Sequence, residues 1–249
     1  MILNLYKKEG ETPLERIRRF TTENPEYKNK KMTYAGRLDP MAEGVLIILT
    51  DEDVHIKDNF LRLDKEYEFE VLWAVSSDTH DILGEVSVGS RAPSDENIEE
   101  DLGSWQGKIE LPYPAYSSRS IKGKPLWVYA REDKLAELEV PKKTMNIIDI
   151  KFYDSKEVKG DILLNYVKKR IETVAGDFRQ HQVIDSWQRG LKETNANDFK
   201  ISRFKAVVAS GTYIRSLVVR MGEKYHTKAL AWSIKRTKVG NYQMTDSVV

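Results

Sequence analysis

Residues 34–44 read Tyr-Ala-Gly-Arg-Leu-Asp-Pro-Met-Ala-Glu-Gly and lead directly into residues 45–49, Val-Leu-Ile-Ile-Leu. The apolar run has the length and the β-branched content of a buried strand. Gly36 lets the backbone turn tightly, and Pro40 fixes φ directly after Asp39. The stretch therefore predicts a carboxylate held on a stiff loop against the edge of a core. Such a loop can present a nucleophile, but many ordinary structural turns are built in the same way.

Outside this loop, several segments have the pattern of strands. Residues 65–73 alternate polar and apolar side chains, which predicts a half-buried strand with Tyr67 on its inner face. Further strands are expected at 2–6, 146–152 and 204–209. A hairpin turn is expected at Gly123, followed by a strand that carries Trp127 and Tyr129.

Other segments have helical spacing. Thr12 and Glu15 form a capping-box pattern that predicts a helix to about residue 20, and the polar stretch 21–32 is expected to be loop. Apolar residues between 161 and 191 indicate two helices that break near Gly176, and a helix is expected over 214–225. A short helix capped by Ser94 is also expected.

Composition narrows the class of protein. The 249 residues are 40% hydrophobic and 32% charged, as in an ordinary globular protein. No apolar run approaches the ~20 residues needed to span a bilayer, and residues 1–6 are too short for a signal peptide. The absence of cysteine excludes disulfides and thiolate metal sites, and the four histidines are scattered. We therefore expect a cytoplasmic protein without a bound metal.

Charge is unevenly distributed along the chain. Residues 1–40 carry 9 basic and 6 acidic residues, and residues 201–249 carry 9 basic and 2 acidic residues. The middle, 41–200, has a net charge of −9, which brings the total to +1. If the two ends meet, they form a basic face that could neutralise RNA phosphates. Charge alone leaves a randomly charged, solvated surface equally open.

The loop around Asp39 resembles the catalytic motif of the TruB family of tRNA pseudouridine synthases, in which this aspartate is catalytic. Other stretches resemble motifs of the same family in the same order, and together they span most of the chain: residues 7–12, 65–67 with 77–84, 111–117, 210–217 and 236–240. The resemblance implies an α+β pseudouridine synthase fold. It has a mixed, mainly antiparallel sheet with flanking helices and a central cleft.

The same resemblance implies roles for individual residues. Asp39 would be the catalytic residue, Tyr67 would stack on the target uracil, and Arg215 would pair with Asp39. An arginine at a helix N-terminus is disfavoured by the helix dipole unless it has an acidic partner, which agrees with that pairing. Lys7, Arg37 and Tyr213 are expected among the substrate-binding residues, and the segment of Lys7 supports the catalytic loop in the family.

Tyr34 is a departure from the family. The family usually has histidine at this position, in the pattern His-x-Gly-x-Leu-Asp, and that histidine enters the T-loop and stacks where the flipped bases have left. Tyrosine also has a flat π-face, so we expect Tyr34 to bind RNA by stacking.

The resemblance therefore implies a tRNA pseudouridine synthase. Its substrate would be a uridine in the T-arm of tRNA, uridine 55 in tRNA numbering, reached by base flipping and isomerised with the help of Asp39. No cofactor or metal is expected, and we expect a monomer. We expect residues 1–249 to form one catalytic domain with a helical insertion around 161–191, without the C-terminal PUA-type domain of longer relatives.

Two alternatives remain open at this point. Arg37 makes the loop similar to the Arg-Leu-Asp motif of the RsuA and RluA synthases, so ribosomal or another RNA could be the substrate. A protein that binds or folds tRNA without catalysis is the second alternative. The presence of Asp39, Tyr67 and Arg215 together argues against that second alternative.

Overall fold

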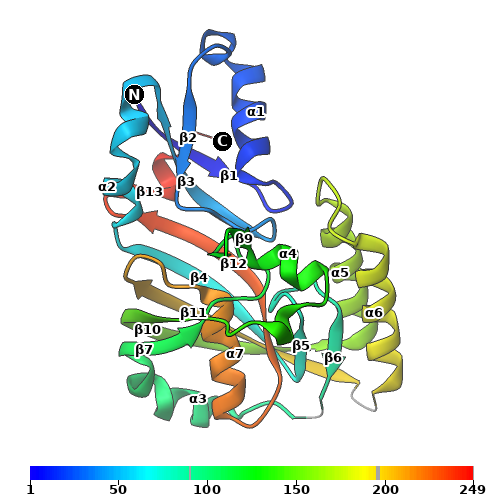
Figure 1. The fold of residues 1–249 in the computed structure, drawn as a ribbon. Helices are drawn as coiled ribbons and strands as arrows, with labels where there is room; N and C mark the ends of the chain where they lie inside the picture. Colours follow the sequence, from blue (N-terminus) through cyan, green and yellow to red (C-terminus); the bar gives the residue numbers. More distant parts are fainter. Residues whose placement is uncertain (90, 195–196, 249) are drawn as a thin grey trace.

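A computed structural model describes residues 1–89, 91–194 and 197–248. Within these ranges the molecule is built around one curved sheet of nine strands (Figure 1). Its main path runs in the order β1 (Ile2–Lys7), β3 (Ala42–Thr50), β12 (Ala229–Val239), β4 (Lys65–Trp73), β11 (Asp198–Val208), β10 (Lys142–Lys159) and β7 (Gly107–Pro112). β2 (Met32–Ala35) pairs with β3, and β13 (Tyr242–Gln243) pairs with β12. Among these pairs, β12 and β3 are parallel and the others are antiparallel, which is the mixed, mainly antiparallel sheet that the sequence predicted.

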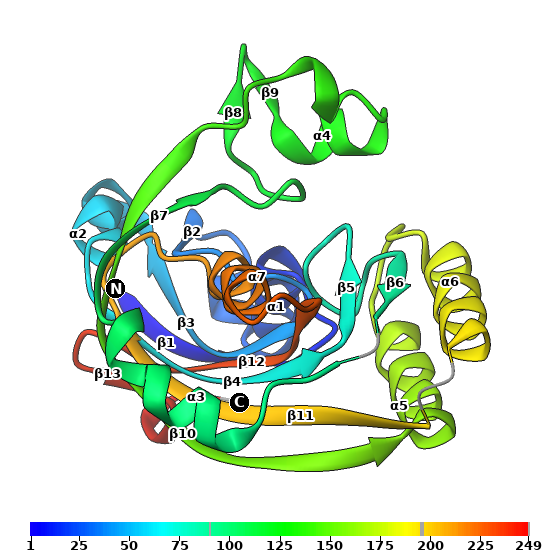
Figure 2. The same cartoon turned by 90° about the horizontal axis from the view of Figure 1, so that it is seen from below.

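Helices flank this sheet and its ends. α7 (Ile214–Lys224) packs on β12 and β4. α5 (Gly160–Glu172) continues from the end of β10 and packs against α6 (Gln180–Glu193) (Figure 2). α1 (Pro13–Glu23) lies beside β1 (Figure 1). The shorter helices are α2 (Lys57–Leu61), α3 (Asp95–Asp101) and α4 (Leu126–Arg131).

An arm stands over the concave side of the sheet (Figure 2). It consists of the hairpin of β8 (Ser120–Ile121) and β9 (Lys124–Pro125), followed by α4. A second small hairpin joins β5 (Val75–Ser77) to β6 (Val86–Val88) and packs against α6.

The core follows from the alternation along β4. Phe69, Val71 and Trp73 point into a cluster with α7, and Leu72 points into a second cluster with α5 and α6 on the other face. Strand β3 is buried on both faces, and the residues of its apolar run, 45–49, are all fully buried. None of the helices within the described ranges is long and apolar enough to cross a membrane.

Two local predictions were wrong. Residues 21–32 were expected to be loop, but α1 continues to Glu23 and a single turn of 3₁₀ helix follows at Pro25–Tyr27. The residues after the Gly123 hairpin were expected to form a strand, but they form α4. Leu126 N–H still donates to the carbonyl oxygen of Arg119 at 2.8 Å, and the chain then turns into a helix that buries the side chain of Leu126.

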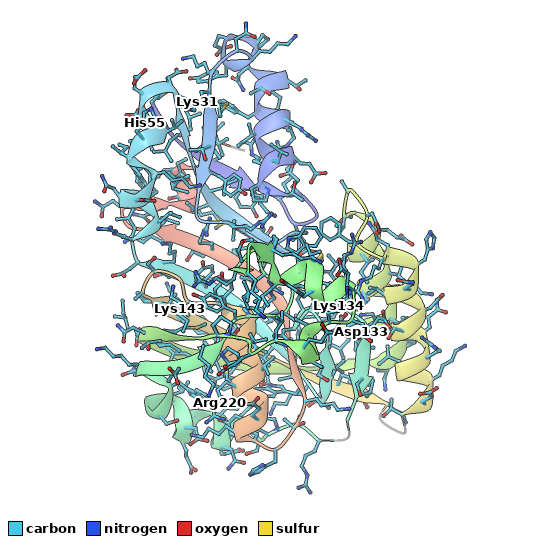
Figure 3. The ribbon with its side chains drawn as sticks, viewed as in Figure 1. Lys31, His55, Asp133, Lys134, Lys143 and Arg220 are labelled. Atoms are coloured by element: carbon cyan, nitrogen blue, oxygen red, sulfur yellow. The ribbon has the colours of Figure 1, made fainter. Side chains whose placement is uncertain are left out.

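Charged side chains are spread over the whole surface of the molecule (Figure 3). Lys31 and His55 lie at the end that carries α1 and α2, whereas Arg220 lies on α7 near the opposite end. Lys143 lies between them, on β10.

Candidate active site

Asp39 lies on the loop between β2 and β3, at the centre of the molecule. The backbone of Gly36 and Gly44 has φ of 84° and 112°, so each end of the loop uses a conformation that favours glycine. A Cβ on Gly44 would also collide with the backbone carbonyl oxygen of Arg236. These two glycines therefore let the loop leave the sheet sharply and hold Asp39 above it.

Two buried cations, Lys7 and Arg236, hold this loop by hydrogen bonds to its backbone carbonyl oxygens. Lys7 Nζ donates to the carbonyl oxygens of Lys8 at 3.0 Å, Pro40 at 3.4 Å and Ala42 at 2.6 Å. Burial lowers the pKa of Lys7 to about 8. Its side chain is fully buried and lines neither cavity described below. Its hydrogen bonds agree with the implied supporting role.

Arg236 holds the other side of the loop. Its Nε donates to the carbonyl oxygen of Val45 at 2.8 Å, and its Nη2 donates to that of Gly36 at 3.0 Å. These two acceptors precede and follow Asp39 in the chain. The guanidinium therefore closes the base of the loop and restricts where the carboxylate can lie.

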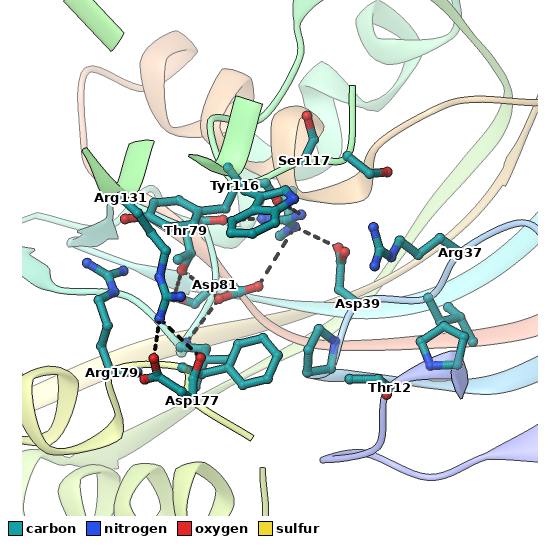
Figure 4. A pocket seen from close by; sticks show the side chains of 18 residues that line it. Thr12, Arg37, Asp39, Thr79, Asp81, Tyr116, Ser117, Arg131, Asp177 and Arg179 are labelled. Atoms are coloured by element: carbon teal, nitrogen blue, oxygen red, sulfur yellow. Dashed lines mark hydrogen bonds and ion pairs between the residues drawn. The ribbon is translucent and has the colours of Figure 1, made fainter. Parts of the chain in front are cut away.

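Arg215, in the first turn of α7, is the partner of Asp39. Its Nε lies 2.8 Å from Asp39 Oδ2 and 3.8 Å from Oδ2 of the buried Asp81 (Figure 4). Nη1 donates to the carbonyl oxygen of Thr79 at 2.5 Å and Nη2 to that of Tyr116 at 3.1 Å. The guanidinium is thus held by four groups, in a geometry that leaves Asp39 facing open space.

Burial and charge act on this cluster in opposite directions. Burial lowers the pKa of Arg215, but the charges of Asp39 and Asp81 outweigh it, so the pKa is raised and the guanidinium stays protonated. Burial raises the pKa of Asp81, against the attraction of Arg215 and a hydrogen bond from Thr79. Arg215 therefore favours the charged form of Asp81, although burial outweighs this attraction and the pKa stays raised.

Two cavities meet at Asp39. The base-side cavity, of about 340 Å³, is lined by Gly36, Ala42, Leu61, Lys65, Tyr67, Ser210, Gly211, Thr212, Tyr213, Ile214, Ile234 and Arg236. The arm-side cavity, of about 320 Å³, is lined by Thr12, Pro13, Pro40, Thr79, Asp81, Leu83, Tyr116, Trp127, Arg131, Asp177, Phe178 and Arg179 (Figure 4). Both are also lined by Arg37, Leu38, Asp39, Ser117, Ser118 and Arg215. Asp39 and Arg215 therefore form part of the boundary between two spaces.

The structure brings most of the predicted site residues together. Tyr67 and Tyr213 line the base-side cavity, and Arg37 lines both cavities. Burial raises the pKa of Tyr213, whose ring packs edge-on against Tyr113 with the ring centroids 5.6 Å apart. Lys7 and Tyr34 are the exceptions: Lys7 is buried beneath the loop, and Tyr34 lies half-buried on β2, outside both cavities.

Several residues at the site were not predicted. Arg131, on α4, donates to Asp177 Oδ2 at 2.9 Å and joins the arm to the loop between α5 and α6. Arg179 donates to Asp78 Oδ2 at 2.8 Å, and its guanidinium carbon lies 4.9 Å from the centroid of the Tyr116 ring. A motif in the sequence contained Asp78, but nothing in the sequence singled out the two arginines.

Among the described residues, no group of three His, Asp or Glu side chains is arranged to hold a metal ion. The donors at the site include guanidinium groups, the ammonium of Lys65 and several hydroxyls, among them those of Tyr67, Tyr213, Ser117 and Ser118. Such a set suits phosphate, sugar and base oxygens.

Solved structures with the same fold are found. A Cbf5-Nop10-Gar1 complex aligns with a TM-score of 0.59 at 17% identity, over 97% of this chain and 49% of that chain. An H/ACA RNP bound to a substrate RNA containing 2′-deoxyuridine aligns with a TM-score of 0.56 at 16% identity, over 97% of this chain and 48% of that chain. The predicted α+β pseudouridine synthase fold is confirmed, and this chain spans about half the length of those chains.

Sequence relatives place the chain in a family. A tRNA pseudouridine synthase B of Clostridium kluyveri is 30% identical, over 99% of this chain and 70% of the relative. That of Caldicellulosiruptor saccharolyticus is 27% identical, over 86% of this chain and 60% of the relative. Residues 25–178 match the family described as "TruB family pseudouridylate synthase (N terminal domain)". This match includes Asp39 and covers more than half of the sequence, so the chain belongs to the TruB family of pseudouridylate synthases, which are enzymes of the isomerase class.

Proposed function

We propose that this chain converts a uridine of the T-loop of tRNA, uridine 55, into pseudouridine, with Asp39 as the catalytic residue. The observation that carries the proposal is the 2.8 Å contact between Arg215 Nε and Asp39 Oδ2 at the boundary of two cavities. A carboxylate at such a boundary can act on the bond that joins a base in one cavity to a sugar at the junction.

The base-side cavity suits a flipped uracil. Tyr67 provides an aromatic face on its wall, and Ile214 and Ile234 provide apolar surface. A base in this cavity has its glycosidic bond beside Asp39, which lies on the loop at the cavity's edge. The enclosed space also holds the uracil after the bond has broken, so that it rotates rather than escapes.

Asp39 has two chemical routes to break the C1′–N1 bond. Its carboxylate oxygen attacks C1′, as in a retaining glycosidase, or it takes the proton from C2′ and leaves a glycal. In both routes Arg215 aims the carboxylate through one hydrogen bond and balances its charge. The uracil then rejoins C1′ through C5, and the reaction balances without a cofactor, a metal ion or a second substrate.

We propose the T-arm of tRNA as the partner and Arg37 as a phosphate contact, because this cation lines both cavities beside Asp39. We propose that residues 1–249 act as one catalytic unit and as a monomer, with α5 and α6 as a helical insertion that braces the arm through Asp177. The cytoplasm is the expected location, since tRNA is processed there.

The test is incubation of the purified protein with an unmodified tRNA transcript, followed by mapping of pseudouridine. We expect one modified position in the T-loop, none in a transcript with cytidine at that position, and none with Asp39→Asn. Ribosomal RNA, tested in parallel, addresses the resemblance of the Arg37 loop to rRNA-modifying synthases. Modification of ribosomal RNA alone, or tight tRNA binding without any pseudouridine, would replace this proposal with one of the two alternatives.

A further inference from the structure

The base-side cavity contains two buried cations that the chemistry of Asp39 does not use. Lys65 is 6% exposed and Arg236 is 1% exposed, and both line the cavity. Within the described residues neither forms an ion pair with a carboxylate, whereas Arg215 lies between two carboxylates. A buried cation without an acidic partner is costly, so its presence in a binding cavity indicates an anionic ligand.

Both cations lie beside Tyr67, the expected stacking partner of the base. Lys65 precedes Tyr67 by two positions on β4, so the two side chains share one face of the sheet. Arg236 lies directly opposite Tyr67 in the register between β12 and β4. A ring stacked on Tyr67 therefore has a cation from each of two neighbouring strands at its edge.

Each cation also has donors left over. Lys65 Nζ donates to the carbonyl oxygens of Leu61 at 2.7 Å and Leu63 at 2.5 Å, which uses two of its three N–H bonds. Arg236 uses Nε and Nη2 for the loop around Asp39, and its Nη1 donates to none of the described residues. Both residues line the cavity, so these donors are available close to a bound base.

The proposed reaction creates an anion in this cavity. When the C1′–N1 bond breaks, its electron pair stays on N1 and spreads over O2 and O4 of the uracil. At the same time Asp39 loses its charge, either by bonding to C1′ or by taking the C2′ proton. The negative charge thus moves from the carboxylate beside Arg215 to the ring beside Tyr67. When C5 bonds to C1′ and its proton moves to N1, the ring is neutral and Asp39 is a carboxylate again.

We propose that Lys65 and Arg236 form an anion site that stabilises the detached uracil, and that Lys65 is a catalytic residue. This inference rests on the proposed function. Arg215 would hold the charge before bond cleavage, and the Lys65–Arg236 pair would hold it afterwards. The pair is fixed in place before the reaction, in a site shielded from water, where such electrostatic stabilisation is strongest.

Lys65→Gln tests the charge of Lys65 separately from its structural role. The glutamine amide has two N–H bonds to replace those that Lys65 gives to Leu61 and Leu63, but it carries no charge. Lys151→Gln is the matched control, because Lys151 is exposed on β10 and its loss changes the net charge equally. A T-arm stem-loop RNA, with uridine or 5-fluorouridine at the target position, is the substrate at pH 7.

We expect Lys65→Gln to slow single-turnover cleavage of the uridine RNA by about 100-fold, the usual cost of one preorganised donor. Fluorine withdraws electrons and stabilises the uracil anion, so the same variant should lose less than about 10-fold with 5-fluorouridine. Cleavage is followed as the disappearance of the nucleoside in digested RNA. The Kd of both RNAs should be unchanged, and Lys151→Gln should behave as the wild type.

A merely structural role for Lys65 would slow both substrates equally, and a phosphate-binding role would raise Kd without slowing the bound RNA. Either result overturns the inference, as does a variant that cleaves uridine at the wild-type rate. If the wild type makes no pseudouridine at all, the proposed function itself is wrong. The two failures are therefore distinguishable.

A pH series on the wild type can still contradict the inference if Lys65→Gln does not fold. Burial and the charge of Arg236 lower the pKa of Lys65 to about 8, and Asp64 and Lys143 are the other charged groups that act on it. The cleavage rate should then fall between pH 7 and pH 8.5 as Lys65 loses its proton. A rate that is constant or rises over this range would contradict the role of Lys65.

Discussion

Arg215 and Asp39 are 176 positions apart in the sequence, and yet Arg215 Nε donates to Asp39 Oδ2 at 2.8 Å. β12 lies between β3 and β4 in the sheet, and α7 packs on β12 and β4, so the first turn of α7 reaches the loop before β3. Asp81 approaches the same guanidinium nitrogen from another loop. The geometry of the site therefore depends on three distant segments and one buried arginine.

Asp39→Asn should fold and bind tRNA but form no pseudouridine. The asparagine amide keeps the size of the side chain but is neither a nucleophile nor a base. Loss of a covalent catalyst costs far more than the ~10²–10⁴ that loss of an acid–base or positioning group costs. Pseudouridine in an RNA digest measures activity, and a filter-binding assay measures the Kd. Appreciable turnover would remove Asp39 from its proposed role.

Asp81→Asn should reduce the rate without abolishing it. Asp39 lines both cavities, whereas Asp81 lines only the arm-side cavity. Asp81 Oδ2 lies 3.8 Å from Arg215 Nε, and Asp81 Oδ1 accepts a hydrogen bond from Thr79 at 2.6 Å. Its loss would let Arg215 shift, and we expect a fall in kcat of about 10²-fold with little change in KM.

The control for this prediction is Asp154→Asn. Asp154 forms an exposed ion pair with Arg203, so its substitution removes one negative charge far from the site. Activity equal to the wild type in Asp81→Asn would show that Arg215 is held adequately by its two backbone acceptors, Thr79 and Tyr116.

The sequence predicted β1, β3, β4 and parts of β10 and β11 from local patterns, but it did not predict β12, which lies between β3 and β4. The alternation along 65–73 and the apolar run 45–49 each report directly which faces of a strand are buried. The family motifs identified Asp39, Tyr67 and Arg215. The motif that contains Lys7 predicted a substrate-binding role for it. The burial of its side chain has no signal in the motif, because it depends on the tertiary structure.

Other features had no local signal. Arg131 and Arg179 reach the site because the arm and the α5–α6 loop meet there, and this depends on how distant segments pack. The segment at Trp127, expected as a strand, is a helix that buries Leu126, and this burial depends on tertiary packing. Motif reading alone therefore found the centre of the site but missed the arginines on its arm side.

The stability of the fold should depend on pH through Lys7. Its pKa is about 8 in the folded state and 10.5 in the unfolded chain, so above pH 8 the unfolded state binds more protons. The free energy of unfolding of the wild type should then rise from pH 8 towards 10.5, relative to Lys7→Met, by at most ~1.4 kcal/mol per pH unit. Urea unfolding at pH 7.5, 8.5 and 9.5 measures this difference. Lys8→Met, at the exposed neighbouring position, controls for the loss of one positive charge, and parallel curves for wild type and Lys7→Met would contradict the prediction.

Binding of tRNA should weaken steeply as salt increases. The segments 1–40 and 201–249 carry net charges of +3 and +7, and we predict that they form a basic face on one side of the cleft. Lys31 and Arg220 lie far apart on the surface, so the cations nearer the cleft, such as Arg37, should contribute most (Figure 3). The Kd of a T-arm RNA, measured from low to high salt, tests this. A flat dependence would show that phosphate contacts do not drive binding.

Tyr34 should act by stacking rather than by proton transfer. It lies on β2, half-buried and outside both cavities, with Lys57 Nζ 5.5 Å from the centroid of its ring. Its hydroxyl forms no hydrogen bond with another described residue, which leaves the ring face as the feature available to RNA. Stacking on a base is worth ~1–3 kcal/mol and needs only a flat π-face.

Two substitutions separate these roles of Tyr34. Tyr34→Phe keeps the ring and removes the hydroxyl, so we expect nearly full activity. Tyr34→Ala removes the ring and should weaken RNA binding or base flipping by roughly tenfold or more. Both are measured as the Kd of a T-arm RNA and as the single-turnover rate of pseudouridine formation. Equal and severe losses in the two variants would mean that the hydroxyl is required, and the stacking role would be wrong.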